Sequence, residues 1–231
     1  MIWFFLLAFA PVFFMQGLYT KRVAKRLPDA QPPSSGVYGQ DTGSVQVLGF
    51  GDSVIAGTGL ENLSESLTAQ LARELYLKNG QPVKWRACGQ NGDKLKDLLV
   101  RTDQLPEIQP DLVVISVGVN DVTRLTKILD WRRDLHALTE KLRSFSVCLV
   151  FIALPPMECF PVLPFPLRWF LGLRASMLDY WLKRETDLYS DVFYVDYGNH
   201  PVWLDMAGDG YHPSEFACKK LAAKIVRIAR F

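Results

Sequence analysis

The sequence contains few cysteines and histidines, and none of them has the spacing of a metal site. The four cysteines are scattered, without a C-x-x-C pair and without a spacing to histidine that suits zinc: Cys88, Cys148, Cys159 and Cys218. A chain of 231 residues with so few cysteines also does not resemble a small domain held together by disulfide bonds. We therefore expect the cysteines to be small core residues, in a chain that suits a reducing compartment and binds no metal.

Motifs of phosphate-binding enzymes and of α/β-hydrolases are also missing. Glycines occupy positions 49, 51, 57 and 59, but they match neither the dinucleotide fingerprint nor the Walker loop with its lysine. The G-x-S-x-G elbow does not occur around Ser53. We therefore expect no nucleotide cofactor.

Positive charge is scarce outside a short basic cluster near the N-terminus. Lys21, Arg22, Lys25 and Arg26 precede every acidic residue and account for the formal net charge of +2. The sequence has 26 basic side chains, so the rest of the chain contains 22 basic and 24 acidic side chains. A domain without a basic surplus does not attract polyanions, so we expect no nucleic-acid partner.

Apolar residues dominate the N-terminus, where residues 2–19 are interrupted only by Pro11, Gln16 and Gly17. As a helix this run would extend about 27 Å, close to the thickness of a bilayer core. Since the basic cluster follows it, the positive-inside rule places the rest of the chain in the cytoplasm. We predict a membrane anchor over residues 1–20. The alternatives are a cleaved signal peptide, giving a periplasmic or secreted protein, and a helix lying flat at the membrane surface.

Residues 21–44 have the composition of a connecting segment. They begin with the basic cluster and continue with many proline, glycine and serine residues, which favour turns and linkers. We predict a linker here and one folded domain over residues 45–231, a length that suits a single core.

Five short apolar runs recur along this domain, and most of them are continuous. Such runs are typical of strands buried on both faces of a parallel sheet. The predicted strands cover residues 45–50, 83–87, 112–117, 147–154 and 192–195, and helical periodicity occurs over 67–79, 131–143, 167–188 and 213–228. Alternating strands and helices imply right-handed crossovers. We therefore predict an α/β protein, a three-layer α/β/α sandwich around a parallel sheet of about five strands.

Chemically active side chains follow four of these strands. Ser53 comes after the first, Gly89 and Gly92 after the second, Asn120 after the third, and Asp209 with His212 beyond the fifth. In open α/β sheets the loops at the carboxyl ends of the strands meet at one rim, where ligands bind. We therefore expect these residues to share one site.

The residue types at this rim suit nucleophilic acyl transfer. A serine hydroxyl is a weak nucleophile that needs a base, and His212 can act as one, with Asp209 holding its other ring nitrogen. Pro213 suits the first position of a helix, which would place His212 at or near the N-cap, where the helix dipole disfavours a charged ring. The Ser53 N–H, a glycine N–H and the Asn120 amide would then bind the oxyanion.

Four short strings resemble a known family: "GDS" at 51–53, "NGD" at 91–93, "GVND" at 118–121 and "DGYHP" at 209–213. Their order and spacing are similar to those of the SGNH/GDSL hydrolases, in particular the small single-domain bacterial esterases, thioesterases and lysophospholipases. The resemblance covers residues from about 45 to the C-terminus and implies a flavodoxin-like fold without a cofactor. It also implies that Ser53 is the nucleophile, that Asp209 and His212 complete a catalytic triad, and that Gly92 and Asn120 form the oxyanion hole with the Ser53 N–H.

Several assignments within this resemblance have alternatives. Val54 stands where the family has leucine, and Gly89 competes with Gly92, which we prefer because Asp93 follows it. Asp205 is an alternative to Asp209, but it lies farther from His212 along the chain. We expect His136 on the solvated face of a helix and His200 in a loop.

A stretch rich in proline and aromatic residues follows the fourth predicted strand, over residues 154–173. It predicts either a stiff packed loop or an apolar, membrane-facing wall that receives an acyl chain. Together with the anchor, the wall favours a lipid-like ester, so we predict a membrane-anchored serine esterase or lipase. An acyltransferase or carbohydrate O-deacetylase with the same triad, and a non-catalytic scaffold that keeps the fold, are the alternatives.

Overall fold

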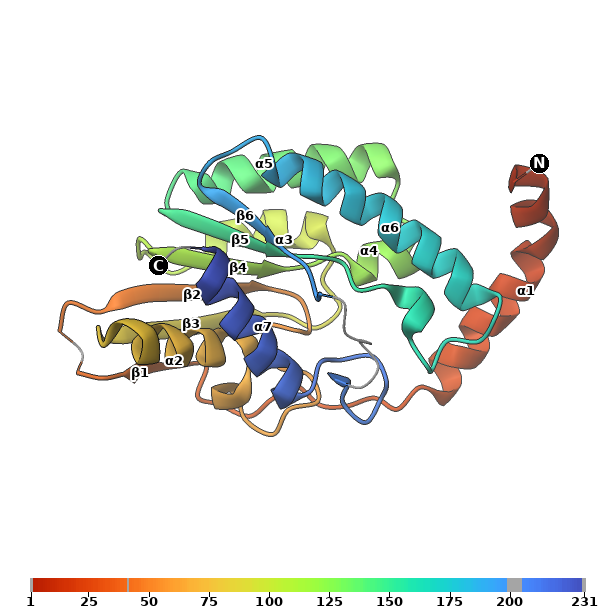
Figure 1. The fold of residues 1–231 in the computed structure, drawn as a ribbon. Coiled ribbons are helices and arrows are strands. Elements are labelled where there is room, and N and C mark those ends of the chain that lie inside the picture. Colours follow the sequence, from red (N-terminus) through yellow and green to blue (C-terminus); the bar gives the residue numbers. More distant parts are fainter. Residues whose placement is uncertain (1, 41, 199–204, 230–231) are drawn as a thin grey trace.

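The computed structural model describes residues 2–40, 42–198 and 205–229, and the side chains from residue 9 onward within them. Six strands form one sheet in the order β1-β3-β2-β4-β5-β6, and all pairs are parallel except β1 with β3 (Figure 1). The strands are β1 (Ser35–Tyr38), β2 (Val45–Gly51), β3 (Val83–Gly89), β4 (Leu112–Ser116), β5 (Cys148–Ile152) and β6 (Val192–Val195). The predicted α/β class is therefore confirmed.

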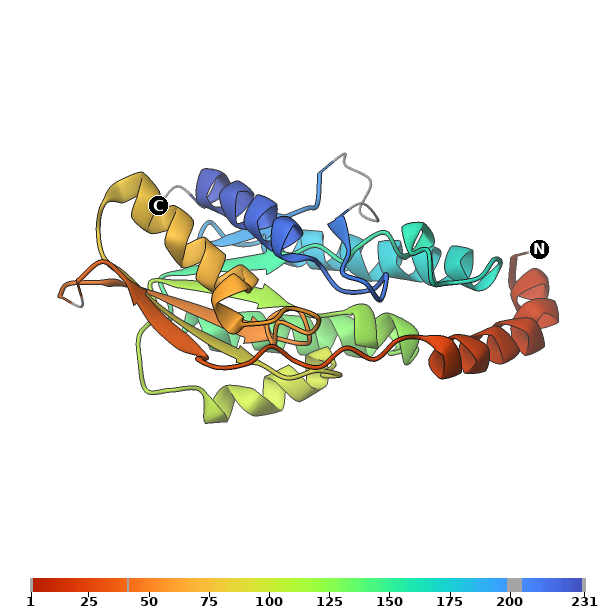
Figure 2. The same cartoon turned by 90° about the horizontal axis from the view of Figure 1, so that it is seen from below.

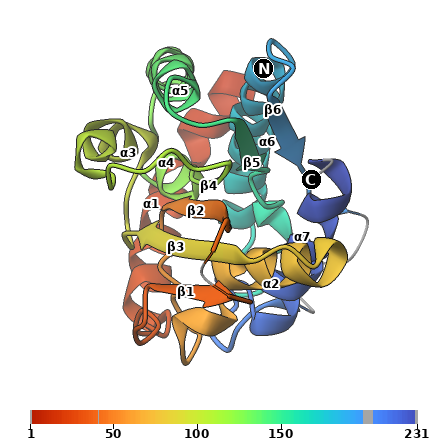
Figure 3. The ribbon, with the colours of Figure 1, turned by 90° about the vertical axis from the view of Figure 1, so that its left-hand side faces the viewer.

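Helices cover both faces of the sheet. The α-helices are α1 (Ile2–Val23), α2 (Leu67–Asn79), α3 (Leu95–Arg101), α4 (Val119–Thr123), α5 (Ile128–Arg143), α6 (Leu167–Thr186) and α7 (Glu215–Ile228), with short 3-10 turns η1 (Leu63–Glu65), η2 (Thr102–Gln104) and η3 (Met157–Cys159). One core cluster joins the sheet to α2 and α7, and the other joins it to α3, α5 and α6 (Figure 3). The molecule is thus the predicted three-layer sandwich.

The continuous apolar strands follow directly from these two covered faces. Val113 and Ile115 of β4 belong to the core beside α5, whereas Leu112 and Val114 belong to the core beside α2 and α7. Successive strand residues point to opposite faces, so a strand covered on both sides needs an apolar residue at every position. This is why a continuous apolar run predicted β4 from the sequence.

The sheet has one strand more than the sequence indicated. Residues 35–38, placed in the predicted linker, form β1 and pair antiparallel with β3, with Ser35 opposite Arg86. The four-residue strand is short and flanked by prolines and glycines, so it lacks a strand signature. Gly36 fits closely over the indole of Trp85, because an added Cβ would lie 2.8 Å from its Nε1.

The predicted membrane-spanning anchor is not supported. Among the described residues, the structure contains no helix with the length and apolar character that a bilayer crossing requires. α1 instead contacts the start of α6: Phe13 stacks on Phe170 at 4.8 Å, and Gln16 donates to Phe165 O and accepts from Leu167 N at 2.7 and 3.0 Å. The polar interruption at Gln16 therefore serves a contact with the domain, while the helix projects beyond the sandwich (Figure 2). The predicted cytoplasmic location is not tested by these contacts and stays a prediction.

The cysteines are all free thiols, as expected. Cys148 and Cys218 are buried in the core, and Cys88 and Cys159 are half-buried. Burial raises the pKa of both Cys148 and Cys218 to about 12, so these two thiols stay protonated and inert.

Candidate functional site

A cavity of about 560 Å³ lies at the carboxyl ends of the central strands. Ser53, which follows β2, and His212, which precedes α7, both line it, together with Ser116 at the end of β4. The parallel arrangement of β2 and β4 brings the ends of these strands side by side, as expected for an open α/β sheet. Two residues that are 159 positions apart in the sequence thus face one space.

Ser53 lies in a tight turn that is tied to the end of β4. The Asp52 N–H donates to Ser116 O at 3.0 Å, and the Thr58 N–H donates to Ser53 O at 3.0 Å. The Asp52 carboxyl accepts from the Val54 N–H at 3.1 Å and from the Ser116 hydroxyl at 3.2 Å. These bonds fix the backbone on both sides of Ser53, whose side chain is almost fully enclosed.

Asp52 is a buried acid directly beside the predicted nucleophile. Burial raises the pKa of Asp52 to about 7, and the two hydrogen bonds it accepts only partly oppose that effect. Its carboxyl does not contact His212 among the bonds of the described residues, so its role is in the turn rather than in holding the base.

Asp209 holds the imidazole of His212. Its Oδ2 lies 2.6 Å from His212 Nδ1, and its Oδ1 accepts the backbone N–H groups of Tyr211 and His212 at 2.9 and 3.1 Å. Burial works to raise the pKa of Asp209, but the hydrogen bonds from His212 and Tyr211 outweigh it and hold that pKa below its ordinary value. Asp209 is therefore an ionised acceptor that leaves Nε2 of the ring available for another partner.

The loop around His212 differs from the predicted helix start. α7 begins at Glu215, and Ser214 is the N-cap, its hydroxyl accepting from the Ala217 N–H at 3.3 Å. His212 therefore precedes the N-cap by two residues, and Pro213 is not in the helix. A short antiparallel bridge between Met206 and Pro213 closes the loop instead.

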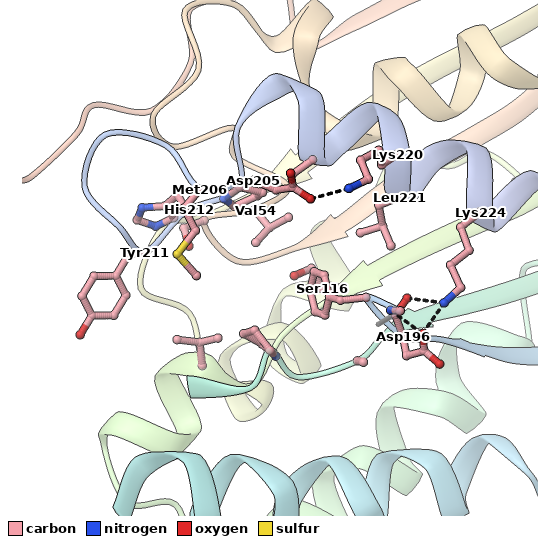
Figure 4. A pocket seen from close by; sticks show the side chains of 18 of the residues that line it. Val54, Ser116, Asp196, Asp205, Met206, Tyr211, His212, Lys220, Leu221 and Lys224 are labelled. Atoms are coloured by element: carbon pink, nitrogen blue, oxygen red, sulfur yellow. Dashed lines mark hydrogen bonds and ion pairs between the residues drawn. The ribbon is translucent and has the colours of Figure 1, made fainter. Parts of the chain in front are cut away.

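The alternative acid, Asp205, has a different partner. Its Oδ2 lies 2.7 Å from Nζ of Lys220 on α7, as Figure 4 shows with a dashed line, away from the imidazole of His212. Asp209, and not Asp205, is the acid bonded to His212.

The two candidate glycines after β3 differ in their surroundings. A Cβ added to Gly89 would lie 2.1 Å from Ala56 N, so glycine is needed there for the strand to pass the Ser53 turn. Gly92 has a positive φ of 90°, and its added Cβ would meet only Arg124 Nη2, at 3.4 Å. Gly89 thus has a packing role, whereas Gly92 leaves open space beside it.

Asn120, at the start of α4, is linked to the loop that follows β3. Its Nδ2 donates to Asp93 O at 3.0 Å, which leaves the second amide hydrogen available. Neither Asn120 nor Gly92 is among the residues that line the cavity. Asn120 is therefore hydrogen-bonded to the segment that contains Gly92, whereas Ser53 and His212 share the lining of the cavity.

The hydrogen bonds of the described residues do not include one between the Ser53 hydroxyl and the His212 ring. Bonds of this kind are often long in a site without substrate and shorten when one binds. His136 lies on the surface, its side chain 59% exposed and 2.9 Å from Glu185, as predicted. His200 lies outside the described residues.

The proline-rich stretch contributes to the cavity wall. Phe160 is fully buried, lines the cavity and packs edge-on against Tyr211 with ring centroids 5.4 Å apart. Met206 and Val54 extend the apolar surface beside His212 (Figure 4). Part of the stretch is therefore a packed loop, and part of it faces the cavity. Its role as a wall that receives an acyl chain stays a prediction.

One residue near the site had no sequence signature. Arg101, the last residue of α3, forms an ion pair with Asp93 and donates to Cys88 O at 3.1 Å. A single arginine at the end of an ordinary helix matches no motif, and only the fold shows that it reaches the ends of β2 and β3.

The GDSL-like lipase/acylhydrolase family model matches residues 50–217. A curated relative, the GDSL-like esterase Rv1075c of Mycobacterium tuberculosis, is 26% identical over 176 residues, which cover 71% of this chain and 56% of that protein. The chain thus spans little more than half the length of that relative.

Solved structures with the same fold include the lipase/acylhydrolase from Enterococcus faecalis, with a TM-score of 0.63 and 24% identity over 79% of this chain and 94% of that one. The psychrotrophic esterase EstA from Pseudoalteromonas sp. has a TM-score of 0.61 and 18% identity over 80% of this chain and 96% of that one. At these identities the likeness concerns the fold.

Proposed function

We propose that this chain, which belongs to the GDSL-like lipase/acylhydrolase family, hydrolyses carboxylic esters with Ser53 as its nucleophile. The observation that supports this most strongly is the shared cavity of Ser53 and His212, with Asp209 bonded to the far side of the imidazole at 2.6 Å. Nucleophile, base and orienting acid are the three parts that acyl transfer by serine requires.

In this mechanism the Ser53 hydroxyl attacks the ester carbonyl carbon while Nε2 of His212 takes its proton. The tetrahedral intermediate collapses as the protonated ring gives that proton to the departing alcohol oxygen, leaving Ser53 acylated. A water molecule, activated by the same nitrogen, then attacks the acyl group and restores the serine. Asp209 keeps Nδ1 protonated and the ring in position throughout, because its carboxylate accepts that N–H.

The Ser53 N–H, the Gly92 N–H and the Asn120 amide serve as oxyanion donors in this proposal. The open space beside Gly92 and the second hydrogen of Asn120 Nδ2 support these roles. Gly89 is less suitable, because its neighbourhood is filled by the backbone of Ala56. Loss of one such donor typically costs about 10²–10³ in kcat.

The substrate in this proposal carries an acyl chain longer than acetyl. Phe160, Met206 and Tyr211 give the cavity an apolar wall beside His212, and its volume of about 560 Å³ is large enough for a chain of several carbons. Each methylene that enters such a wall contributes about 0.8 kcal/mol of binding. Lipid-like esters therefore suit the site better than acetylated sugars.

A series of p-nitrophenyl esters tests both parts of the proposal. We expect kcat/KM to rise from acetate to medium-chain esters, and Ser53→Ala to abolish hydrolysis of all of them. Tyr197→Phe is the matched control, because it removes another hydroxyl from the lining of the same cavity and should keep most of the activity. Retained activity in Ser53→Ala would refute the assignment of the nucleophile, and a steady fall in kcat/KM beyond acetate would refute the substrate class.

A further inference from the structure

Arg101 bonds to the segments that carry the proposed nucleophile and the proposed oxyanion donors. Its guanidinium forms an ion pair with the Asp93 carboxylate, donates to Cys88 O at 3.1 Å and approaches Gly51 O at 3.5 Å. Only 17% of its side chain is exposed, and it does not line the cavity. A single side chain from α3 thus contacts the ends of both β2 and β3.

Two of these contacts lie close in sequence to a proposed catalytic group. Gly51 is two residues before Ser53, and Asp93 directly follows Gly92. The backbone carbonyl of Asp93 in turn accepts the amide of Asn120 at 3.0 Å. Arg101 is therefore within one hydrogen-bonded network with all three segments that must converge on the ester carbonyl.

The guanidinium is also fixed by its surroundings. It lies over the ring of Phe50, with Cζ 5.5 Å from the ring centroid, on the strand that leads to the nucleophile turn. Asp93 is buried, and a buried carboxylate needs a charged partner, which Arg101 supplies. The planar fork of arginine can bond a carboxylate and a carbonyl at set angles, whereas the single ammonium of lysine cannot reproduce this arrangement.

We propose that Arg101 is a positioning residue that sets the placement of the Gly92 and Asn120 donors relative to the Ser53 turn. This inference rests on the proposed function, because it assigns Arg101 a role in the same reaction. Misplacing a reacting group by about 1 Å can lower a rate about 10²-fold, while substrate binding in the cavity is left intact. The loss should therefore appear in kcat rather than in KM.

Arg101→Lys, which keeps the charge and loses the fork, tests the inference. We expect kcat for a medium-chain p-nitrophenyl ester to fall about 10- to 100-fold, with KM within about twofold of the wild type. Asp93→Asn weakens the same ion pair by changing the acidic partner, and it should also lower kcat while leaving KM nearly unchanged. With two variants, the test does not depend on one of them being well folded.

Arg143→Lys is the matched control. Arg143 is also the last residue of a helix, pairs with an aspartate, Asp191, at 3.0 Å, and lies over an aromatic ring, that of Tyr189, at 4.3 Å. It is remote from the cavity lining. We expect its variant to lose thermal stability to a similar extent as Arg101→Lys while keeping the wild-type kcat.

The inference fails if Arg101→Lys and Asp93→Asn lower the melting temperature as Arg143→Lys does but keep the wild-type kcat, or if the loss lies in KM. That failure is distinct from failure of the proposed function. If Ser53→Ala is inactive and Arg101→Lys is fully active, only the positioning role is refuted. If Ser53→Ala is active, the proposed function itself is refuted.

Discussion

At the level of single residues, the candidate site is built from short contacts around His212 and around the Ser53 turn. The short strings of the sequence predicted that Ser53, Asp209 and His212 share a site. The structure bonds Asp209 to His212 at 2.6 Å and places Ser53 in the lining of the same cavity, while their catalytic roles stay a prediction. Arg101 was not identifiable, because its contacts are to carbonyl groups and a carboxylate that only the folded sheet brings near it. A motif indicates candidate reacting groups, but it does not indicate the side chains that hold them in place.

Asp209→Asn should lower kcat by about 10³–10⁴, because an amide cannot accept the Nδ1–H of His212 as a carboxylate does and favours the wrong tautomer. Ester hydrolysis rates measured beside a circular dichroism spectrum separate this effect from unfolding. Asp205→Asn is the control from the same loop: it loses the ion pair with Lys220 but should retain its rate. Equal losses in the two variants would contradict the role given to Asp209.

Asp52 should make the stability of the protein depend on pH between acid and neutral values. Its folded pKa is raised from 3.8 to about 7 by burial, so the folded state holds the proton more tightly than the unfolded chain. The stabilising contribution is complete below pH 3.8 and is lost as the pH rises to about 7. Denaturant titrations should therefore show Asp52→Asn gaining stability relative to the wild type between these two values, and no further change at higher pH. A constant difference across this range would rule out the shift.

At the level of helices and strands, the local signals at the two ends of α2 were reliable. Ser66 caps the start of α2 by accepting from the Ala69 N–H, and Gly80 ends it with a left-handed φ of 67°, so the predicted helix at 67–79 matches the structure. α7 was predicted to start at Pro213, but its cap is Ser214. β1 was missed because its pairing with β3, and not its own four residues, makes it a strand.

Gly80→Ala should lower the free energy of unfolding by about 1 kcal/mol, because alanine is strained at a positive φ although nothing lies within 4 Å of the added Cβ. Gly17→Ala offers the opposite case: Gly17 lies inside α1 with equally open space, so alanine there should not destabilise the chain. Urea unfolding of both variants checks this. A loss in Gly17→Ala as large as in Gly80→Ala would show that left-handed strain is not the cause.

At the level of the whole molecule, the continuous apolar strands predicted the layered architecture. The composition of residues 2–19 predicted a helix, which α1 confirms, but it did not predict the contact of that helix with α6. An apolar run looks the same whether lipid or protein surrounds it, and the contacts of Phe13 and Gln16 with the start of α6 arise only in the folded chain. The cavity is likewise a property of the assembled sheet, since its walls come from loops that are far apart in sequence.

In the proposed mechanism, the fold presents Ser53 as an activated nucleophile beside His212. The most direct measurement is covalent labelling with a fluorophosphonate, followed by mass spectrometry of the digested protein. One adduct should form, on the peptide that contains Ser53, and it should form far more slowly in His212→Ala. An adduct on a different residue, or labelling of Ser53 at an equal rate without the imidazole, would contradict the account.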